Sequence, residues 1–249
     1  MKITSVNNKI IKETVKLQQK KYRDESGLFL LEGENCIEEA LEFGIKIKHI
    51  FVAEGYNKFN NYNPIEATET VLAKIATTTT PPKCIAVGIQ KKSIWDTKYK
   101  KIILLEDIKD AGNLGTIIRT SCAFDIDAII LYGDTVDLYN PKCVRASVGN
   151  LWKIPVFNIK DFNTIKELSK DFTPIATLPN NTNTTMLKKF STSNKLIIMF
   201  GTESSGLSEE LKNFALKNGK SITIEMCNKV ESLNLSISVG IILYKLFIK

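Results

Sequence analysis

The sequence predicts an α/β protein built on a parallel sheet. Continuous apolar runs at residues 102–105, 128–131 and 196–200 alternate with helical patterns, which is typical of strands covered on both faces. The chain has 249 residues, of which 43% are hydrophobic and 24% charged. A chain of this length can bury a substantial core without disulfides or a structural metal. Its composition excludes the disordered and fibrous classes.

The first 92 residues are expected to form a small α/β unit. Apolar residues lie among lysines over residues 5–21, which predicts an amphipathic helix with a basic outer face. The next expected elements are a strand at 28–31, a helix at 34–43 that Gly44 ends, and strands at 47–53 and 84–89. Pro81 and Pro82 predict a loop before the last strand. A polar connector at residues 91–101 is the expected boundary between domains 1–92 and 93–249.

The second domain is expected to hold a doubly wound sheet. A helix over 114–124 follows the strand at 102–105. Further strands at 174–176 and 222–224 extend the sheet, and a final helix runs to residue 249.

Most of the net positive charge lies at one end of the chain. The formal net charge is +7, and the first 23 residues hold seven lysines and arginines against one glutamate, a net charge of +6. A compact basic block favours a polyanionic partner, whereas a solvated helix face is the alternative explanation. The candidate residues for binding that partner are Lys12, Lys16, Lys20, Lys21 and Arg23.

The rare residues exclude several kinds of site. The five cysteines form no CxxC pair and His49 is the only histidine, so no zinc site is expected and the thiols are interpreted as reduced. His49 precedes an apolar stretch and is interpreted as a strand residue, which leaves no histidine for a catalytic triad. The start lacks the apolar run of a signal peptide, and no segment has about 18 uninterrupted apolar residues. We therefore expect a cytoplasmic protein without a membrane segment or a metal.

Three loops follow apolar runs, where open α/β sheets bind ligands. Residues 106–120 contain Gly112 and Gly115 at a helix start, with Arg119 further along that helix. Residues 201–208 have the outline of a phosphate-binding loop but carry Leu207 where that loop needs lysine, which argues against nucleotide hydrolysis. Residues 224–236 place Ser232 and Asn234 at the start of the final helix, where either could cap it or help to bind an anionic ligand.

Taken together, the three loops resemble the three motifs of the SpoU or TrmH family of RNA ribose 2′-O-methyltransferases, in the SPOUT class. The first motif is matched by residues 112–124, the second by 201–207 and the third by 224–236. Residues 1–90 resemble the ribosomal-protein-L30-like RNA-binding domain that rRNA-directed members carry. The resemblance implies S-adenosylmethionine as methyl donor, a trefoil knot in the catalytic domain, a homodimer with the donor site at or beside the interface, and rRNA, most directly 23S rRNA, as substrate.

The resemblance also implies roles for single residues. The catalytic group would be Asn113, Arg119, Glu203, Ser232 and Asn234. The donor would be held by Thr177, Leu178, Gly201, Ile224, Met226 and Leu233, mainly through backbone groups. A ribose 2′-hydroxyl must lose its proton as it attacks the methyl carbon, and an arginine almost never deprotonates. Arg119 is therefore expected to act by binding the neighbouring RNA phosphate, which helps to accept the proton.

Two departures from the family pattern and two alternatives stay open. Asp125 stands where many members have glycine, which is expected to alter a turn, and Thr202 replaces the commoner asparagine, which is expected to affect donor binding. A tRNA substrate is the alternative within the same enzyme class. A non-catalytic RNA-binding or ribosome-assembly protein is the other alternative, although such a protein need not keep all five catalytic residues.

Overall fold

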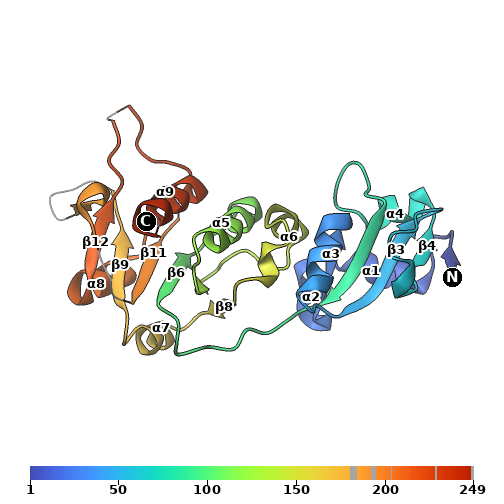
Figure 1. The fold of residues 1–249 in the computed structure, drawn as a ribbon, viewed down its shortest axis with the longest axis horizontal. Coiled ribbons are helices and arrows are strands. Elements are labelled where there is room, and N and C mark those ends of the chain that lie inside the picture. The colour runs from blue at the N-terminus through green and yellow to red at the C-terminus, as the bar shows by residue number, and fades with distance from the viewer. Residues whose placement is uncertain (180–183, 192–194, 203, 228, 248–249) are drawn as a thin grey trace. The chain divides into compact units, whose positions relative to one another are not determined.

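The computed structural model describes residues 1–179, 184–191, 195–202, 204–227 and 229–247 (Figure 1). The protein is α/β, as predicted, and divides into two units. The first comprises Met1–Lys92 with Asp137–Lys153, and the second comprises Ser93–Val136 with Ile154–Lys249. The first boundary between the two units follows Lys92, within the connector expected at residues 91–101. The segment Asp137–Lys153 was expected in the second domain, whereas its contacts are with the first unit.

A five-stranded mixed sheet, ordered β1-β4-β3-β5-β2, forms the centre of the first unit. The elements of this unit are β1 (Lys2–Ile3), α1 (Lys9–Lys16), α2 (Lys20–Ser26), β2 (Leu28–Glu32), α3 (Glu34–Glu42), β3 (Ile47–Ala53), η1 (Asn60–Tyr62), β4 (Ile65–Ala67), α4 (Glu69–Ile75), β5 (Cys84–Ile89), α6 (Pro141–Ala146) and η2 (Asn150–Trp152). The predicted strands at 28–31, 47–53 and 84–89 are confirmed. His49 lies in β3, as its apolar surroundings indicated.

The single basic helix predicted over residues 5–21 is wrong, because two helices, α1 and α2, occupy this stretch. The chain turns between them at Gln18 and Gln19, where Gln19 has an extended backbone. The side-chain amide of Gln18 donates to the carbonyls of Lys74, Ile75 and Ala76 at 2.9–3.2 Å. These carbonyls lie at the end of α4 and would otherwise lack partners, so Gln18 caps α4 from the turn between α1 and α2.

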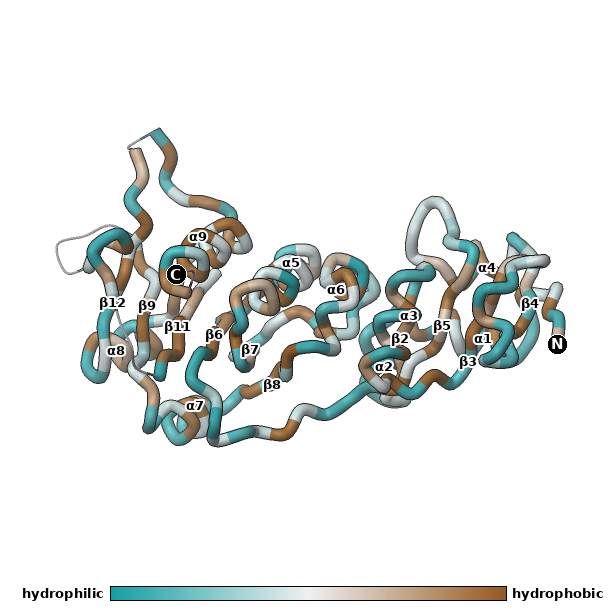
Figure 2. Tube along the Cα trace, viewed as in Figure 1, coloured by the Kyte–Doolittle hydropathy of each residue, from teal (hydrophilic) through white to brown (hydrophobic). Residues whose placement is uncertain are grey.

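The second unit contains a seven-stranded sheet in the order β10-β12-β9-β11-β6-β7-β8, and every pair in it is parallel. Its elements are β6 (Lys101–Glu106), α5 (Ala111–Ala123), β7 (Ala128–Tyr132), β8 (Val156–Ile159), α7 (Phe162–Leu168), β9 (Thr173–Thr177), β10 (Thr185–Met186), η3 (Leu187–Lys189), β11 (Leu196–Phe200), α8 (Glu209–Asn218), β12 (Lys220–Thr223) and α9 (Leu235–Phe247). The predicted parallel sheet is confirmed, and Figure 2 shows its central strands as hydrophobic stretches. The knot that the resemblance implies stays a prediction.

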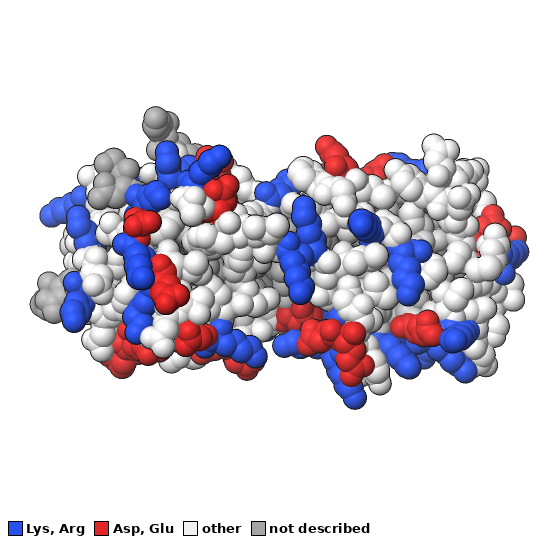
Figure 3. All heavy atoms as spheres, turned by 90° about the horizontal axis from the view of Figure 1, so that it is seen from below, with Lys and Arg blue, Asp and Glu red and all other residues white. Residues whose placement is uncertain are grey.

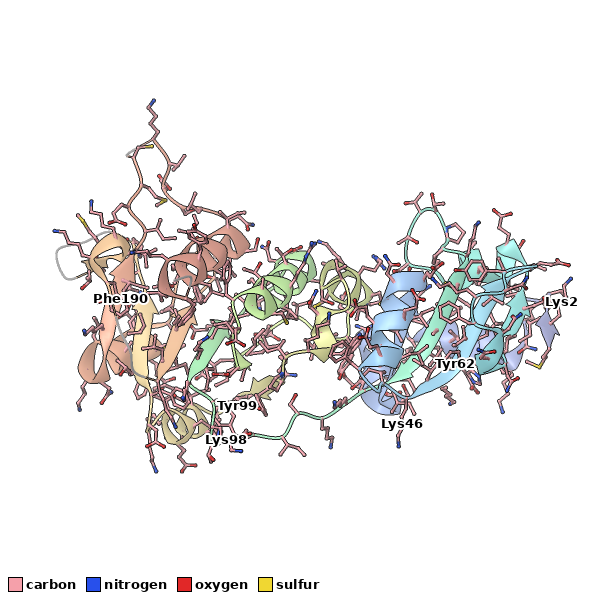
Figure 4. The ribbon with its side chains drawn as sticks, viewed as in Figure 1. Lys2, Lys46, Tyr62, Lys98, Tyr99 and Phe190 are labelled. Atoms are coloured by element: carbon pink, nitrogen blue, oxygen red, sulfur yellow. The ribbon has the colours of Figure 1, made fainter. Side chains whose placement is uncertain are left out.

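Alternate residues of each central strand face opposite layers of helices. Ile102 and Leu104 of β6 belong to an apolar cluster that includes Ile165 of α7 and Leu211 of α8. The other layer contains α5 and α9, which pack against each other (Figure 1). Trp95, near the start of the second unit, stacks edge-on against Tyr99 and Phe157 of the same unit (Tyr99 is labelled in Figure 4). Burial on both faces explains why these strands read as continuous apolar runs.

The strand order brings the three motif loops to one edge of the sheet. Strands β12, β9, β11 and β6 are consecutive neighbours and all run in the same direction. Their carboxyl ends, and the loops that follow them, therefore lie together although they are far apart in sequence.

Helix α5 begins three residues earlier than predicted and ends at an unusual turn. The carboxylate of Asp110 accepts the backbone N–H of Asn113 at 2.8 Å and so caps the helix. Beyond its end, Asp125 has a φ of +55°, in the left-handed region where glycine is common. Its carboxylate pairs with Lys101 at 3.1 Å. Asp125 therefore makes the turn that a glycine would otherwise make.

Candidate functional site

A pocket of about 400 Å³ lies at the edge of the sheet where the motif loops meet. It is lined by residues that follow β9, β11 and β12 and by residues of α9. All six predicted donor-binding residues line it, together with the predicted catalytic residue Ser232: Thr177, Leu178, Gly201, Ile224, Met226, Leu233 and Ser232. The structure thus gathers into one pocket residues that are as much as 56 positions apart in the chain, as Thr177 and Leu233 are.

The second motif loop folds back on itself through backbone contacts. Thr202 and Gly206 exchange two backbone hydrogen bonds at 3.0 Å. The Thr202 hydroxyl also accepts the N–H of Ser205 at 3.0 Å and contacts its hydroxyl at 2.7 Å. Thr202, the departure from the family pattern, therefore helps to shape the loop that lines the pocket. The predicted catalytic residue Glu203 lies outside the described residues.

Gly201 has no room for a side chain. A Cβ atom at this position would lie 2.0 Å from the backbone carbon of Gly206 and 2.1 Å from its oxygen. Leu207 is 1% exposed and belongs to the apolar cluster beneath α8. Packing therefore explains the leucine at the position where a phosphate-binding loop would present lysine.

Two of the predicted catalytic residues contact each other. The side-chain amide of Asn234 donates to the side-chain oxygen of Asn113 at 3.1 Å. The oxygen of Asn234 accepts the backbone N–H of Ser236 at 2.9 Å and its hydroxyl at 2.6 Å. Asn234 therefore caps α9 and also joins it to the start of α5, whereas its catalytic role stays a prediction.

Arg119 stands apart from the pocket. It is exposed on α5 and is not among the residues that line the pocket. Within the part of the chain that the structure describes, no hydrogen bond or ion pair engages its guanidinium. The group is accordingly available to a ligand that approaches from solvent, such as a phosphate.

Four of the five predicted RNA-binding residues are exposed in the first unit. Lys12 and Lys16 lie on α1, and Lys20 and Lys21 lie on α2. We call these four lysines the basic patch. Lys16 and Lys21 place their ammonium groups 5.4 and 5.8 Å from the centre of the Tyr22 ring. On the face of the molecule shown in Figure 3, basic side chains are accompanied by acidic ones.

The expectation for Arg23 is corrected by its burial. Arg23 is 1% exposed, pairs with Asp137 at 2.6 Å and donates to the carbonyl of Leu17 at 2.7 Å. A guanidinium that is buried and already paired holds the first unit together and does not present its charge to RNA.

Sequence reasoning missed three charged residues around the pocket. Lys212 and Glu231 line it, and Glu106 holds one of its loops from the end of β6. Glu231 directly precedes Ser232, so its position in the third motif was the available signal. No sequence signal identified Lys212 or Glu106, because their roles depend on which strands are neighbours in the sheet.

Two kinds of feature are missing from the residues that the structure describes. Within that part of the chain, no group of three or more His, Cys, Asp or Glu side chains could hold a metal ion. None of the helices in the same residues is both long and apolar enough to cross a membrane.

Comparisons with known proteins agree with this arrangement. The SpoU rRNA Methylase family matches residues 100–244, and the MRM3-like substrate binding domain matches residues 8–86. An uncharacterized tRNA/rRNA methyltransferase from Synechocystis is 32% identical, covering 98% of this chain and 92% of its own length. The 23S rRNA (guanosine(2553)-2′-O)-methyltransferase RlmP of Bacillus subtilis is 28% identical and covers 98% of both chains.

A solved structure has the same fold over nearly the whole chain. The AdoMet-bound rRNA methyltransferase from Sinorhizobium meliloti is similar with a TM-score of 0.88 and 28% identity, covering 98% of this chain and 96% of that one. The family resemblance stated from the three motif loops is therefore confirmed. The chain belongs to the SpoU rRNA Methylase family.

Proposed function

We propose that this protein transfers the methyl group of S-adenosylmethionine to a ribose 2′-hydroxyl of 23S rRNA. The observation that carries the proposal is the single pocket that all six predicted donor residues line, beside the contact between Asn113 and Asn234. RlmP of Bacillus subtilis, which matches over 98% of both chains and is named for this reaction, supports the substrate, and so does the match of residues 8–86 to a substrate binding domain. An rRNA substrate also fits the cytoplasmic location expected from the sequence.

The pocket binds the donor, and the nearby side chains position the RNA. Thr177, Leu178, Gly201 and the residues of the third loop hold the donor, whose sulfonium supplies the methyl group. Asn113, Ser232 and Asn234 position the ribose, and in-line placement of the hydroxyl is a large part of the rate gain in such transfers. The guanidinium of Arg119 binds the phosphate beside the reacting ribose, and this phosphate accepts the hydroxyl proton. The first unit binds the surrounding RNA through the basic patch.

A homodimer is part of the proposal. Ile237, Ile241 and Tyr244 lie three or four positions apart on α9 and are 54%, 38% and 59% exposed. Phe124, the residue directly after α5, stacks edge-on against Tyr244, which extends the apolar face beyond α9. A second copy of the chain that covers this face removes it from water. Light scattering of the purified protein should give the mass of a dimer, and Ile241→Asp should shift it to that of a monomer.

A labelled-methyl assay tests the reaction. Purified protein, methyl-labelled S-adenosylmethionine and unmodified 23S rRNA should give labelled RNA, and the labelled linkage should resist alkali because its 2′-oxygen is blocked. Arg119→Ala should abolish transfer while calorimetry shows donor binding largely unchanged. Lys170→Ala, which removes an exposed charge elsewhere in the second unit, should leave both unchanged.

Other outcomes decide between the alternatives. Label in tRNA and none in 23S rRNA would establish a tRNA enzyme and overturn the rRNA assignment. RNA binding without any affinity for S-adenosylmethionine would establish the non-catalytic binding protein.

A further inference from the structure

Glu106 is a buried carboxylate to which no motif assigns a role. It is the last residue of β6 and is 5% exposed. Its oxygen Oε2 accepts the backbone N–H of Ser208 at 2.7 Å. Ser208 is the residue that caps α8, a helix of ten residues. A buried carboxylate is costly unless it is hydrogen-bonded, and the positive end of a helix dipole is a favourable place for it.

This hydrogen bond fixes the far end of the second motif loop. The near end is fixed already, because Phe200 of β11 pairs in register with Leu105 of β6. Glu106 follows Leu105 directly, so neighbouring residues of one strand hold both ends of the loop. Between these ends, the two backbone bonds of Thr202 and Gly206 close the loop on itself.

The clamped loop forms one wall of the pocket, whereas Glu106 does not touch the pocket. Gly201, Gly206 and Leu207 line the pocket, and Lys212 of α8 lines it as well. Any effect of Glu106 on a bound molecule must therefore pass through the loop and the start of α8.

We propose that Glu106 is a positioning residue for the methyl donor, which it serves by holding the second motif loop in the shape that binds the donor. The inference rests on the proposed function, since it assumes that the pocket takes S-adenosylmethionine. A loop freed from β6 must be ordered again at each binding event, which weakens binding. Once the donor is bound the loop is ordered in the wild type and in the variant alike, so kcat at saturating donor should change little.

Two substitutions separate the hydrogen bond from the bulk of the side chain. Glu106→Leu keeps a similar volume but removes the acceptor, and we expect the dissociation constant of S-adenosylmethionine and its KM to rise at least tenfold, with kcat within about twofold. Glu106→Gln retains a carbonyl oxygen that can accept the Ser208 N–H, and we expect binding within about threefold of wild type. The conservative variant thus restores what the apolar one loses.

Glu210→Leu is the matched control. Glu210 is an exposed carboxylate in the first turn of α8, and it accepts the hydroxyl of Tyr132 at 3.2 Å instead of a backbone N–H of the loop. Burial, together with Glu210, raises the pKa of Tyr132 to about 12. The Tyr132 hydroxyl therefore keeps its proton over the pH range of the assay. We expect Glu210→Leu to bind the donor like wild type.

Calorimetry with S-adenosylmethionine and with S-adenosylhomocysteine measures binding without RNA or turnover. If wild type binds neither, the proposed function itself fails. If wild type binds and Glu106→Leu, shown to be folded by its circular dichroism, binds equally well, the positioning role alone is refuted. Should Glu106→Leu not fold, hydrogen exchange of Glu106→Ala, which also removes the acceptor, decides: faster exchange of residues 204–208 than in Glu210→Leu supports the clamp, and equal exchange contradicts it.

Discussion

Arg23 and Asp137 form a buried ion pair across 114 positions of sequence. The Nε and Nη2 atoms of Arg23 lie 2.7 and 2.6 Å from one oxygen of Asp137, and the two side chains are 2% and 10% exposed. A second pair, between Arg145 and the buried Glu32 at 2.9 Å, joins the same two parts of the chain. These contacts make Asp137–Lys153 an integral part of the first unit, although the flanking strands β7 and β8 belong to the sheet of the second.

We predict that breaking the pair destabilises the first unit. Removing one partner of a buried ion pair typically costs about 3–5 kcal/mol, because the other charge stays buried alone. Asp137→Asn and Arg23→Met should each lower the midpoint of urea unfolding, and the double variant should lose less than the sum of the two. Additive losses would show that the two side chains act independently.

The glycine at the start of the second motif loop should be indispensable for donor binding. Gly201→Ala puts a methyl group against the backbone of Gly206, which cannot move without breaking its bonds to Thr202. We expect a loss of at least tenfold in affinity for S-adenosylmethionine, measured by calorimetry. Gly206→Ala is the comparison, since its Cβ would meet nothing within 4 Å and only its φ of +68° is unfavourable, at about 1–2 kcal/mol. An equal effect of the two would argue against the steric explanation.

The basic patch should set the salt dependence of RNA binding. Replacing its four lysines with alanine should weaken RNA binding and reduce the slope of log K against log salt by up to about three. The slope falls because fewer phosphate contacts form, and so fewer counterions are released on binding. Filter binding at several salt concentrations measures the slope. The control replaces four exposed lysines of the second unit: Lys98, Lys100, Lys170 and Lys217. An unchanged slope in the patch variant would remove α1 and α2 from the RNA footprint.

His49 should titrate below its ordinary range. Its burial and the neighbouring charge of Lys48 lower the pKa of its imidazole from 6.5. The unfolded chain then takes up the proton first, so this contribution to stability is present above pH 6.5 and is lost as the pH falls through the folded pKa. Because it is the only histidine, its NMR signals give the pKa directly. His49→Gln should unfold with less pH dependence between pH 7.5 and about 5, and a pKa of 6.5 or above would contradict the expectation.

The cysteines should differ widely in reactivity. Burial raises the pKa of the Cys36 thiol to about 12 and that of Cys84 to about 11, whereas Cys227 is exposed. A thiol reagent at pH 8 should therefore label Cys227 first. Cys227→Ser should remove the fast phase and Cys122→Ser should keep it. S-adenosylmethionine should slow the labelling of Cys227, because Met226 beside it lines the pocket.

The position of the candidate site could be predicted from residue types and spacing, because apolar runs identify the strands and ligands bind where parallel strands end. The single donor residues were implied by the resemblance of the loops to the family's motifs. The contact between Asn113 and Asn234 could not be read from spacing, since it depends on α5 packing against α9. Arg23 was assigned to RNA from its charge alone, and only its burial beside Asp137 corrects that assignment.

The sequence by itself determined the fold class, the parallel sheet and the motif loops, because hydrophobic periodicity and glycine placement are local signals. The tertiary structure decided which charges face water, where Glu106 acts and to which unit Asp137–Lys153 belongs. Those outcomes depend on contacts between residues far apart in the chain: 102 positions separate Glu106 from Ser208, and 114 separate Arg23 from Asp137. A buried charge is tolerated only where a partner meets it, and the order of residues alone does not say where that partner lies.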